Sequence, residues 1–123
     1  MDWTAMYDAP NDLVRVAVQG KVEEQAADQM LRELVALGKQ HNAWRFLVDS
    51  TRATLAMSVA QIRDRPRHYA ASGFQPSARF AVVFSEWTPD AVLLEATIER
   101  EHFHRRVFID VEEALRWLKS DRP

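Results

Sequence analysis

The order in which strand-like and helix-like patterns follow one another restricts the fold more than any other feature of this sequence. Two stretches of alternating apolar residues come first, and helical and strand patterns then alternate to the end of the chain. Strands are expected at residues 2–8, 12–19, 43–49, 78–85 and 105–109, and helices at 22–37, 58–72, 89–103 and 111–118. The order ββαβαβαβα requires crossover connections and a largely parallel sheet. Because the first two strands form a hairpin, the predicted fold is α/β, with helices packed on a mixed, mostly parallel sheet.

Local signals mark the ends of several of these helices. Ser58, with Gln61 three residues later, has the pattern of a capping box, and Thr88 is a favourable N-cap. Gly38 stands where a glycine commonly ends a helix, which sets the end of the first helix at residue 37. Pro66 removes a backbone donor, so the second helix is expected to bend or break there.

Composition excludes several classes of protein. A chain of 123 residues is one ordinary domain, taken here as residues 1–123. The absence of cysteine rules out disulfide scaffolds and thiol chemistry, and a net charge of −2 argues against a general nucleic-acid binder. No apolar run is long enough to span a membrane, and residues 1–4 lack the pattern of a secretion signal. A cytoplasmic location is therefore expected.

Two stretches carry a resemblance to a known family. Phe46-Leu47-Val48-Asp49 is a strand that ends in aspartate before a polar segment and a helix, and residues 107–118 form a closing strand and helix. With the element order, these stretches make the chain resemble the STAS fold of anti-sigma-factor antagonists, in particular the SpoIIAA-like group of small bacterial proteins. The resemblance spans nearly the whole chain. It implies a non-catalytic regulatory domain that acts by binding another protein.

Members of that family are switched by phosphorylation of a serine at the start of the helix after this strand. Ser58, within Ala56-Met57-Ser58-Val59-Ala60, stands at the matching place. The aspartate before the serine and the glycine after it, which the family's loop carries, are missing here. The helix cap that Ser58 forms with Gln61 explains the serine without a switch.

Polar residues gather where two inner strands are expected to end, which is where ligands usually bind in open α/β sheets. The predicted partner or ligand surface consists of Asp49, Ser50, Thr51, Arg52, Ser58, Glu86 and Trp87. A second interpretation is structural, since loops rich in serine and threonine satisfy their own backbone, and Asp49 would cap amides of that loop.

A few large apolar residues have no evident place in the core. Val92 and Leu93 lie beside the buried stripe of their helix, and Trp87 and Trp117 add further apolar surface. Because a monomer of this size has little use for such surface, a homodimer is predicted, with Val92, Leu93 and Trp117 as contacts.

Charged groups suggest no cofactor. The basic residues Arg63, Arg65, Arg67 and His68 surround Pro66, and Glu95, Glu99 and Glu101 are expected to neutralise this basic segment. The pair formed by Glu99 and His102 lacks the second Glu-x-x-His motif that a di-iron site needs, so neither a metal nor another cofactor is expected.

Two alternatives to a protein-binding domain remain open. The first is a binder of a small apolar molecule in a cleft between sheet and helices, opened by the kink at Pro66 and lying near Tyr69 and Trp87. The second is a cofactor-free enzyme that uses Asp49 and His68, although no sequence motif places these two residues together.

Overall fold

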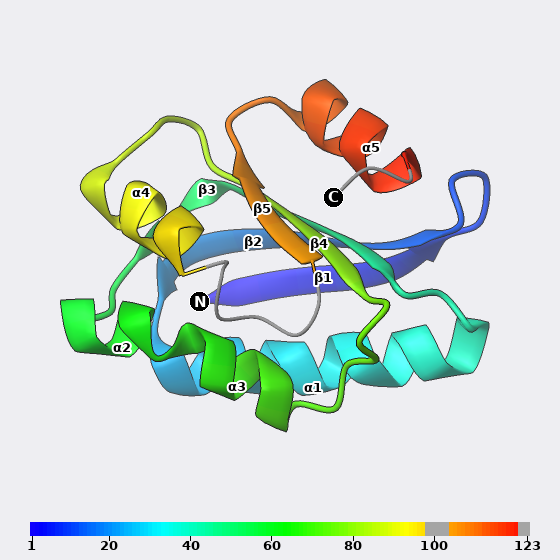
Figure 1. Cartoon of the computed structure of the whole chain (residues 1–123), viewed down its shortest axis with the longest axis horizontal. Coiled ribbons are helices and arrows are strands. Elements are labelled where there is room, and N and C mark those ends of the chain that lie inside the picture. Colours follow the sequence, from blue (N-terminus) through cyan, green and yellow to red (C-terminus); the bar gives the residue numbers. More distant parts are fainter. Residues whose placement is uncertain (98–103, 121–123) are drawn as a thin grey trace.

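A single mixed sheet organises the fold. The computed structural model describes residues 1–97 and 104–120. The strands are β1 (Asp2–Asp8), β2 (Leu13–Val22), β3 (Arg45–Leu55), β4 (Arg79–Val83) and β5 (His104–Phe108). They lie in the order β1-β2-β3-β4-β5, with β1 and β2 antiparallel and the other neighbours parallel (Figure 1). The predicted α/β class and mixed, mostly parallel sheet are confirmed.

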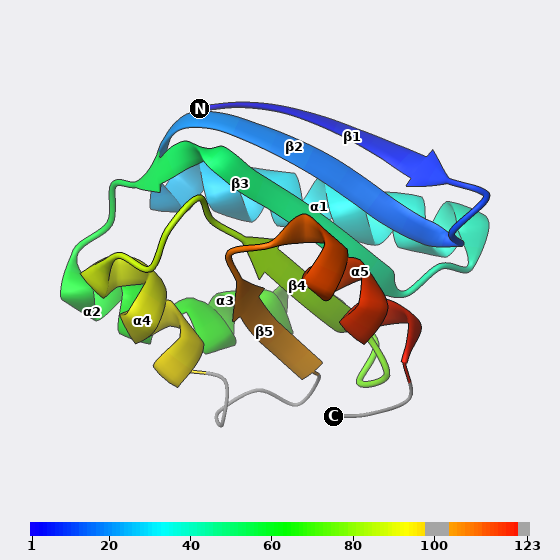
Figure 2. The same ribbon diagram turned by 90° about the horizontal axis from the view of Figure 1, so that it is seen from above.

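Helices cover the two faces of the sheet unequally. The helices are α1 (Glu24–His41), α2 (Val59–Arg63), α3 (Arg65–Ala71), α4 (Pro89–Ala96) and α5 (Val111–Lys119). The first four pack on one face and bury the larger core, in which Phe46 and Phe80 stack with ring centroids 4.7 Å apart. Of the helices in residues 1–97 and 104–120, α5 alone lies on the other face, where it covers β3, β4 and β5 (Figure 2). The outer pair β1 and β2 therefore has one open face.

The first helix runs past its predicted end. α1 continues to His41, and Asn42, with φ +49°, adopts the left-handed conformation at its end. Gly38 lies inside the helix and is buried. A Cβ on Gly38 would lie 2.9 Å from the Ala43 carbonyl oxygen and 3.1 Å from the Phe46 ring. Gly38 thus permits a close approach of helix and strand, and asparagine tolerates the turn that ends the helix.

The third strand is longer than its apolar pattern. β3 continues beyond Asp49 to Leu55, and residues 52–55 pair with residues 19–22 of β2 after an irregularity in the register. Phe46 and Val48 face the larger core before that irregularity, whereas Ala53 and Leu55 pack against the same core after it. The irregularity reverses the alternation of faces, so the pattern of the strand is broken after Asp49. The prediction of a polar loop after Asp49 is therefore wrong for residues 50–55, which belong to β3.

The break near Pro66 falls two residues earlier, at Asp64, which separates α2 from α3. Pro66 occupies the first turn of α3, where a missing N–H donor costs nothing. Gly73, with φ +95°, follows the end of α3, and Phe74 folds back against Phe80 with ring centroids 4.5 Å apart.

The predicted N-caps are confirmed. Thr88 accepts a hydrogen bond from the Ala91 amide, and Ser58 caps α2. Asp110 also caps α5, since it accepts from the amides of Glu112 and Glu113. The continuation of α4 to residue 103 falls on residues 98–103, which lie outside the described residues. None of the helices in the described part of the chain has the length and hydrophobicity needed to cross a bilayer.

Candidate functional site

The polar residues that follow Val48 lie in β3 and divide between its two faces. Asp49 faces the side of α5 and lines a shallow recess of about 240 Å³ over β1 and β2. Its carboxylate accepts hydrogen bonds from the Thr51 amide at 3.0 Å and the Thr51 hydroxyl at 2.7 Å. These bonds agree with the structural interpretation of Asp49. Ser50 is buried on the opposite face, and Arg52 is exposed.

Ser58 caps α2 as its pattern predicts. Its hydroxyl accepts a hydrogen bond from the Gln61 amide at 3.1 Å, and the Ser58 amide donates to the Gln61 side chain at 2.9 Å. Ser58 is also exposed, so its hydroxyl is accessible from solvent. The helix cap accounts for this serine in the folded chain.

Exposed apolar side chains gather at the end of the molecule to which the parallel strands point. Val59 on α2, Trp87 before α4 and Val92 on α4 are 52%, 47% and 54% exposed. Helices α2 and α4 contact each other and lie at this end in both views (Figures 1 and 2). These three residues, Val59, Trp87 and Val92, are called the α2–α4 patch below.

Two predicted oligomer contacts do not belong to this patch. Trp117 is only 6% exposed, packs against Phe108 and receives the guanidinium of Arg79 over its ring at 4.3 Å. Its assignment as a surface contact is wrong because α5 uses it to cover the second face of the sheet. Leu93 is partly buried and packs against the larger core.

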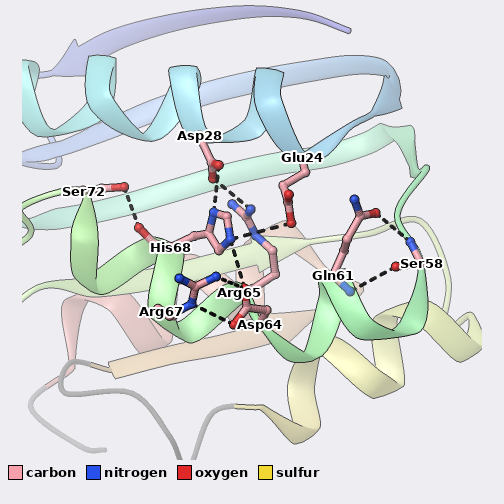
Figure 3. Close-up of polar contacts among 9 residues, drawn as sticks. All are labelled: Glu24, Asp28, Ser58, Gln61, Asp64, Arg65, Arg67, His68 and Ser72. Atoms are coloured by element: carbon pink, nitrogen blue, oxygen red, sulfur yellow. Dashed lines mark hydrogen bonds and ion pairs between the residues drawn. The ribbon is translucent and has the colours of Figure 1, made fainter.

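Charged side chains join α1 to α3 in a cluster that the sequence did not reveal (Figure 3). The interhelix cluster consists of Glu24, Asp28, Asp64, Arg65, Arg67 and His68. Arg65 donates to Asp28 at 2.9 Å, although the Arg65 side chain is only 5% exposed. His68 places Nδ1 at 2.8 Å from the same carboxylate and Nε2 at 3.3 Å from Asp64.

The cluster balances charge and fixes α3 on α1. The Arg67 guanidinium, which hydrogen bonds to Asp64, lowers the pKa of that carboxyl to about 2. The same pair raises the pKa of Arg67. The acidic partners of the basic segment are thus Asp64 and two residues of α1, Glu24 and Asp28. The prediction that Glu95 neutralises the basic segment is wrong, because its carboxylate accepts a hydrogen bond from the Val107 amide. Glu99 and Glu101, which were predicted to do the same, lie outside the described residues.

The spacing of residues in the sequence accounts for two pairs of side chains in this cluster, but not for the contact between the pairs. Glu24 and Asp28 are four residues apart in α1, and Asp64, which caps α3, has the same spacing to His68, so each pair lies on one side of its helix. Which of these faces meet depends on how α3 docks, and local spacing does not encode that.

A cavity of about 50 Å³ lies beneath α3, between the helices and the carboxyl ends of β3 and β4. Apolar side chains of the larger core make most of its wall, among them Leu31 and Leu94. Its polar lining includes Ser50, Arg65 and Tyr69. The predicted cleft near Tyr69 is thus present as this small cavity, whereas Pro66 and Trp87 do not line it.

The two residues of the enzymatic alternative lie on opposite sides of the sheet. Asp49 lines the recess on the side of α5, whereas His68 faces α1 across the other layer. Among residues 1–97 and 104–120, no group of three or more potential ligands is placed to hold a metal ion. His102 lies outside this range, and His104 is exposed at the start of β5.

The sequence matches no protein-family model, and no curated protein is detectably similar to it.

Proposed function

We propose that this protein is a non-catalytic regulatory domain of the STAS type that binds another protein through the α2–α4 patch. The observation that carries the proposal is the exposure of Val59, Trp87 and Val92 on neighbouring segments at one end of the sheet. Large apolar residues on the surface of a soluble domain mark interaction sites when they are grouped. A tryptophan in such a group is a common anchor of protein interfaces.

The partner proposed first is a second copy of this chain. Charged side chains of both signs border the patch, since Glu86 precedes Trp87, and Arg63 lies one helical turn from Val59. In a twofold dimer the same surface of both copies meets, so charges of both signs beside one patch suit a self-complementary interface. An interface of standard size needs about 800 Å² from each partner. The accessible surface of 6875 Å² accommodates this easily.

The test compares the dimer dissociation constants of three proteins by sedimentation equilibrium. Val92→Asp places an unpaired charge in the patch and is expected to weaken association by at least about tenfold. Met6→Asp, at the exposed Met6 on the open face of β1, is the matched control and should leave association unchanged. Equal effects of the two substitutions, or no association of the wild-type chain, would contradict the proposal.

The cavity favours a second function, and we also propose that the protein binds a small molecule between the sheet and α3. Ligands of open α/β sheets bind at the carboxyl ends of the strands, and this cavity lies at the ends of β3 and β4. Its mostly apolar wall with a few polar groups is typical of ligand sites. A ligand of the cavity should shift the amide resonances of Ser50 and Tyr69, which line it. Ala27→Leu would fill the cavity from α1, and the same ligand should then cause no such shifts.

A further inference from the structure

The cavity has a polar end made by one buried hydroxyl. Ser50 is 5% exposed and lines the cavity, and among the described residues its hydroxyl has no hydrogen-bond partner. Buried hydroxyls in folded proteins almost always have a partner, either protein or a bound molecule. Ser50 therefore offers a hydrogen-bonding position to a polar atom that enters the cavity.

Arg65 defines what kind of polar atom fits. Arg65 also lines the cavity, and its hydrogen bond to Asp28 uses one of its two terminal nitrogens. Arginine donates and never accepts, whereas a serine hydroxyl can do either. The atom that satisfies both Ser50 and Arg65 is a hydrogen-bond acceptor, and in a small molecule that is an oxygen.

The charges around Arg65 exclude a further carboxylate. In the interhelix cluster, the Asp28 carboxylate already pairs with Arg65 at 2.9 Å. An anionic ligand would leave water for a mostly apolar cavity and would compete with Asp28 for the guanidinium. An uncharged oxygen takes the same hydrogen bonds without that cost.

The cavity volume sets the size of the molecule. One water-sized position corresponds to roughly 10–15 Å³, so a cavity of about 50 Å³ holds roughly three to five such positions. A ligand of about five non-hydrogen atoms fits with small movements of the surrounding side chains.

We propose that the cavity binds a small uncharged carbonyl compound, with its oxygen accepting from Ser50 and Arg65 and its short apolar body facing the side chains of the core. This inference rests on the second proposed function, because it names the chemical class of the ligand in that cavity.

The test titrates three molecules of five non-hydrogen atoms each into the ¹⁵N-labelled protein. Butanone carries the carbonyl, and 2-methyl-1-butene replaces the carbonyl oxygen by a methylene group. Propionate replaces the methyl group next to the carbonyl by a negatively charged oxygen. Dissociation constants come from the amide shifts of residues that line the cavity. Butanone is expected to bind at least about five times more tightly than either of the others, since one hydrogen bond separates it from the alkene.

A serine substitution locates the effect. Ser50→Ala should weaken the binding of butanone about fivefold and leave the alkene unchanged. Ser85→Ala, at an exposed serine outside the cavity wall, is the control and should change neither constant.

Other results would contradict either the carbonyl ligand alone or the small-molecule site as a whole. Alkene binding as tight as that of butanone, or tightest binding by propionate, would refute the carbonyl ligand and leave a small-molecule site in place. If neither butanone nor the alkene shifts the cavity resonances, the second proposed function fails together with this inference.

Discussion

The ion pair between Arg65 and Asp28 should hold α3, which covers the cavity, against α1. A double-mutant cycle measures the contribution of this pair to the free energy of unfolding. Asp28→Asn removes the charge that partners a guanidinium whose side chain is only 5% exposed. Breaking a fully buried pair in this way costs about 3–5 kcal/mol. Because Asp28 itself is 22% exposed, water relieves part of this penalty, and we expect a loss of about 2–3 kcal/mol.

The second arm of the cycle removes the guanidinium. Arg65→Met replaces it with an apolar side chain, and the double variant then has no uncompensated buried charge. The double variant should therefore be more stable than the sum of the two single effects predicts, by about 1–2 kcal/mol. Urea denaturation with a constant m-value is the assay.

Asp64→Asn is the control for general loss of negative charge on the cluster, because Asp64 pairs with the exposed Arg67. It should change the free energy of unfolding much less than Asp28→Asn does. Additive effects of Asp28→Asn and Arg65→Met would refute the reasoning, since they would show that the pair is not coupled. A loss as large for Asp64→Asn would also refute it.

Three further predictions concern local structure. Gly38→Ala should destabilise the protein by about 1–2 kcal/mol in urea denaturation, because the close contact with the Ala43 carbonyl outweighs a gain of about 1 kcal/mol in helix propensity; a more stable variant would contradict the close packing. Ser58→Ala should cost about 1 kcal/mol through loss of the α2 cap, and an unchanged midpoint would show that the capping box contributes nothing. Bonding to Arg67 lowers the pKa of Asp64 from 3.8 to about 2. The stability that this carboxylate contributes is therefore complete above about pH 5 and is lost as the pH falls towards 2. Asp64→Asn should flatten that part of the pH profile, and an unaltered profile would exclude this role.

The sequence predicted the elements of the fold because their signals are local. The alternation in β1 and β2 and the apolar run of β4 depend only on neighbouring residues, and so do the caps at Ser58 and Thr88. These signals are sufficient to specify an α/β sheet with a hairpin at one edge.

The errors arose where tertiary packing decides the role of a residue. Gly38 has the appearance of a helix terminator, but its function is to let Ala43 and Phe46 approach the helix. Trp117 has no evident partner in the sequence, because its environment is created when α5 packs on the second face of the sheet. The polar residues after Asp49 resemble a loop, although pairing with β2 keeps them in a strand.

The candidate sites were only partly predictable for the same reason. Trp87 and Val92 were recognised as surplus apolar residues, and their exposure agrees with that interpretation. The interhelix cluster combines residues that are up to 44 positions apart, from Glu24 to His68, so it exists only once α3 has docked on α1. Ser50 was assigned to a surface, whereas the strand turns it into the cavity.

Hydrogen–deuterium exchange at two protein concentrations tests the central claim, binding through the α2–α4 patch, most directly. On concentration, we predict slower exchange in residues 58–63 and 85–96, which contain the patch, and no change in β1. Exchange that is independent of concentration everywhere, or protection confined to β1, would contradict the account.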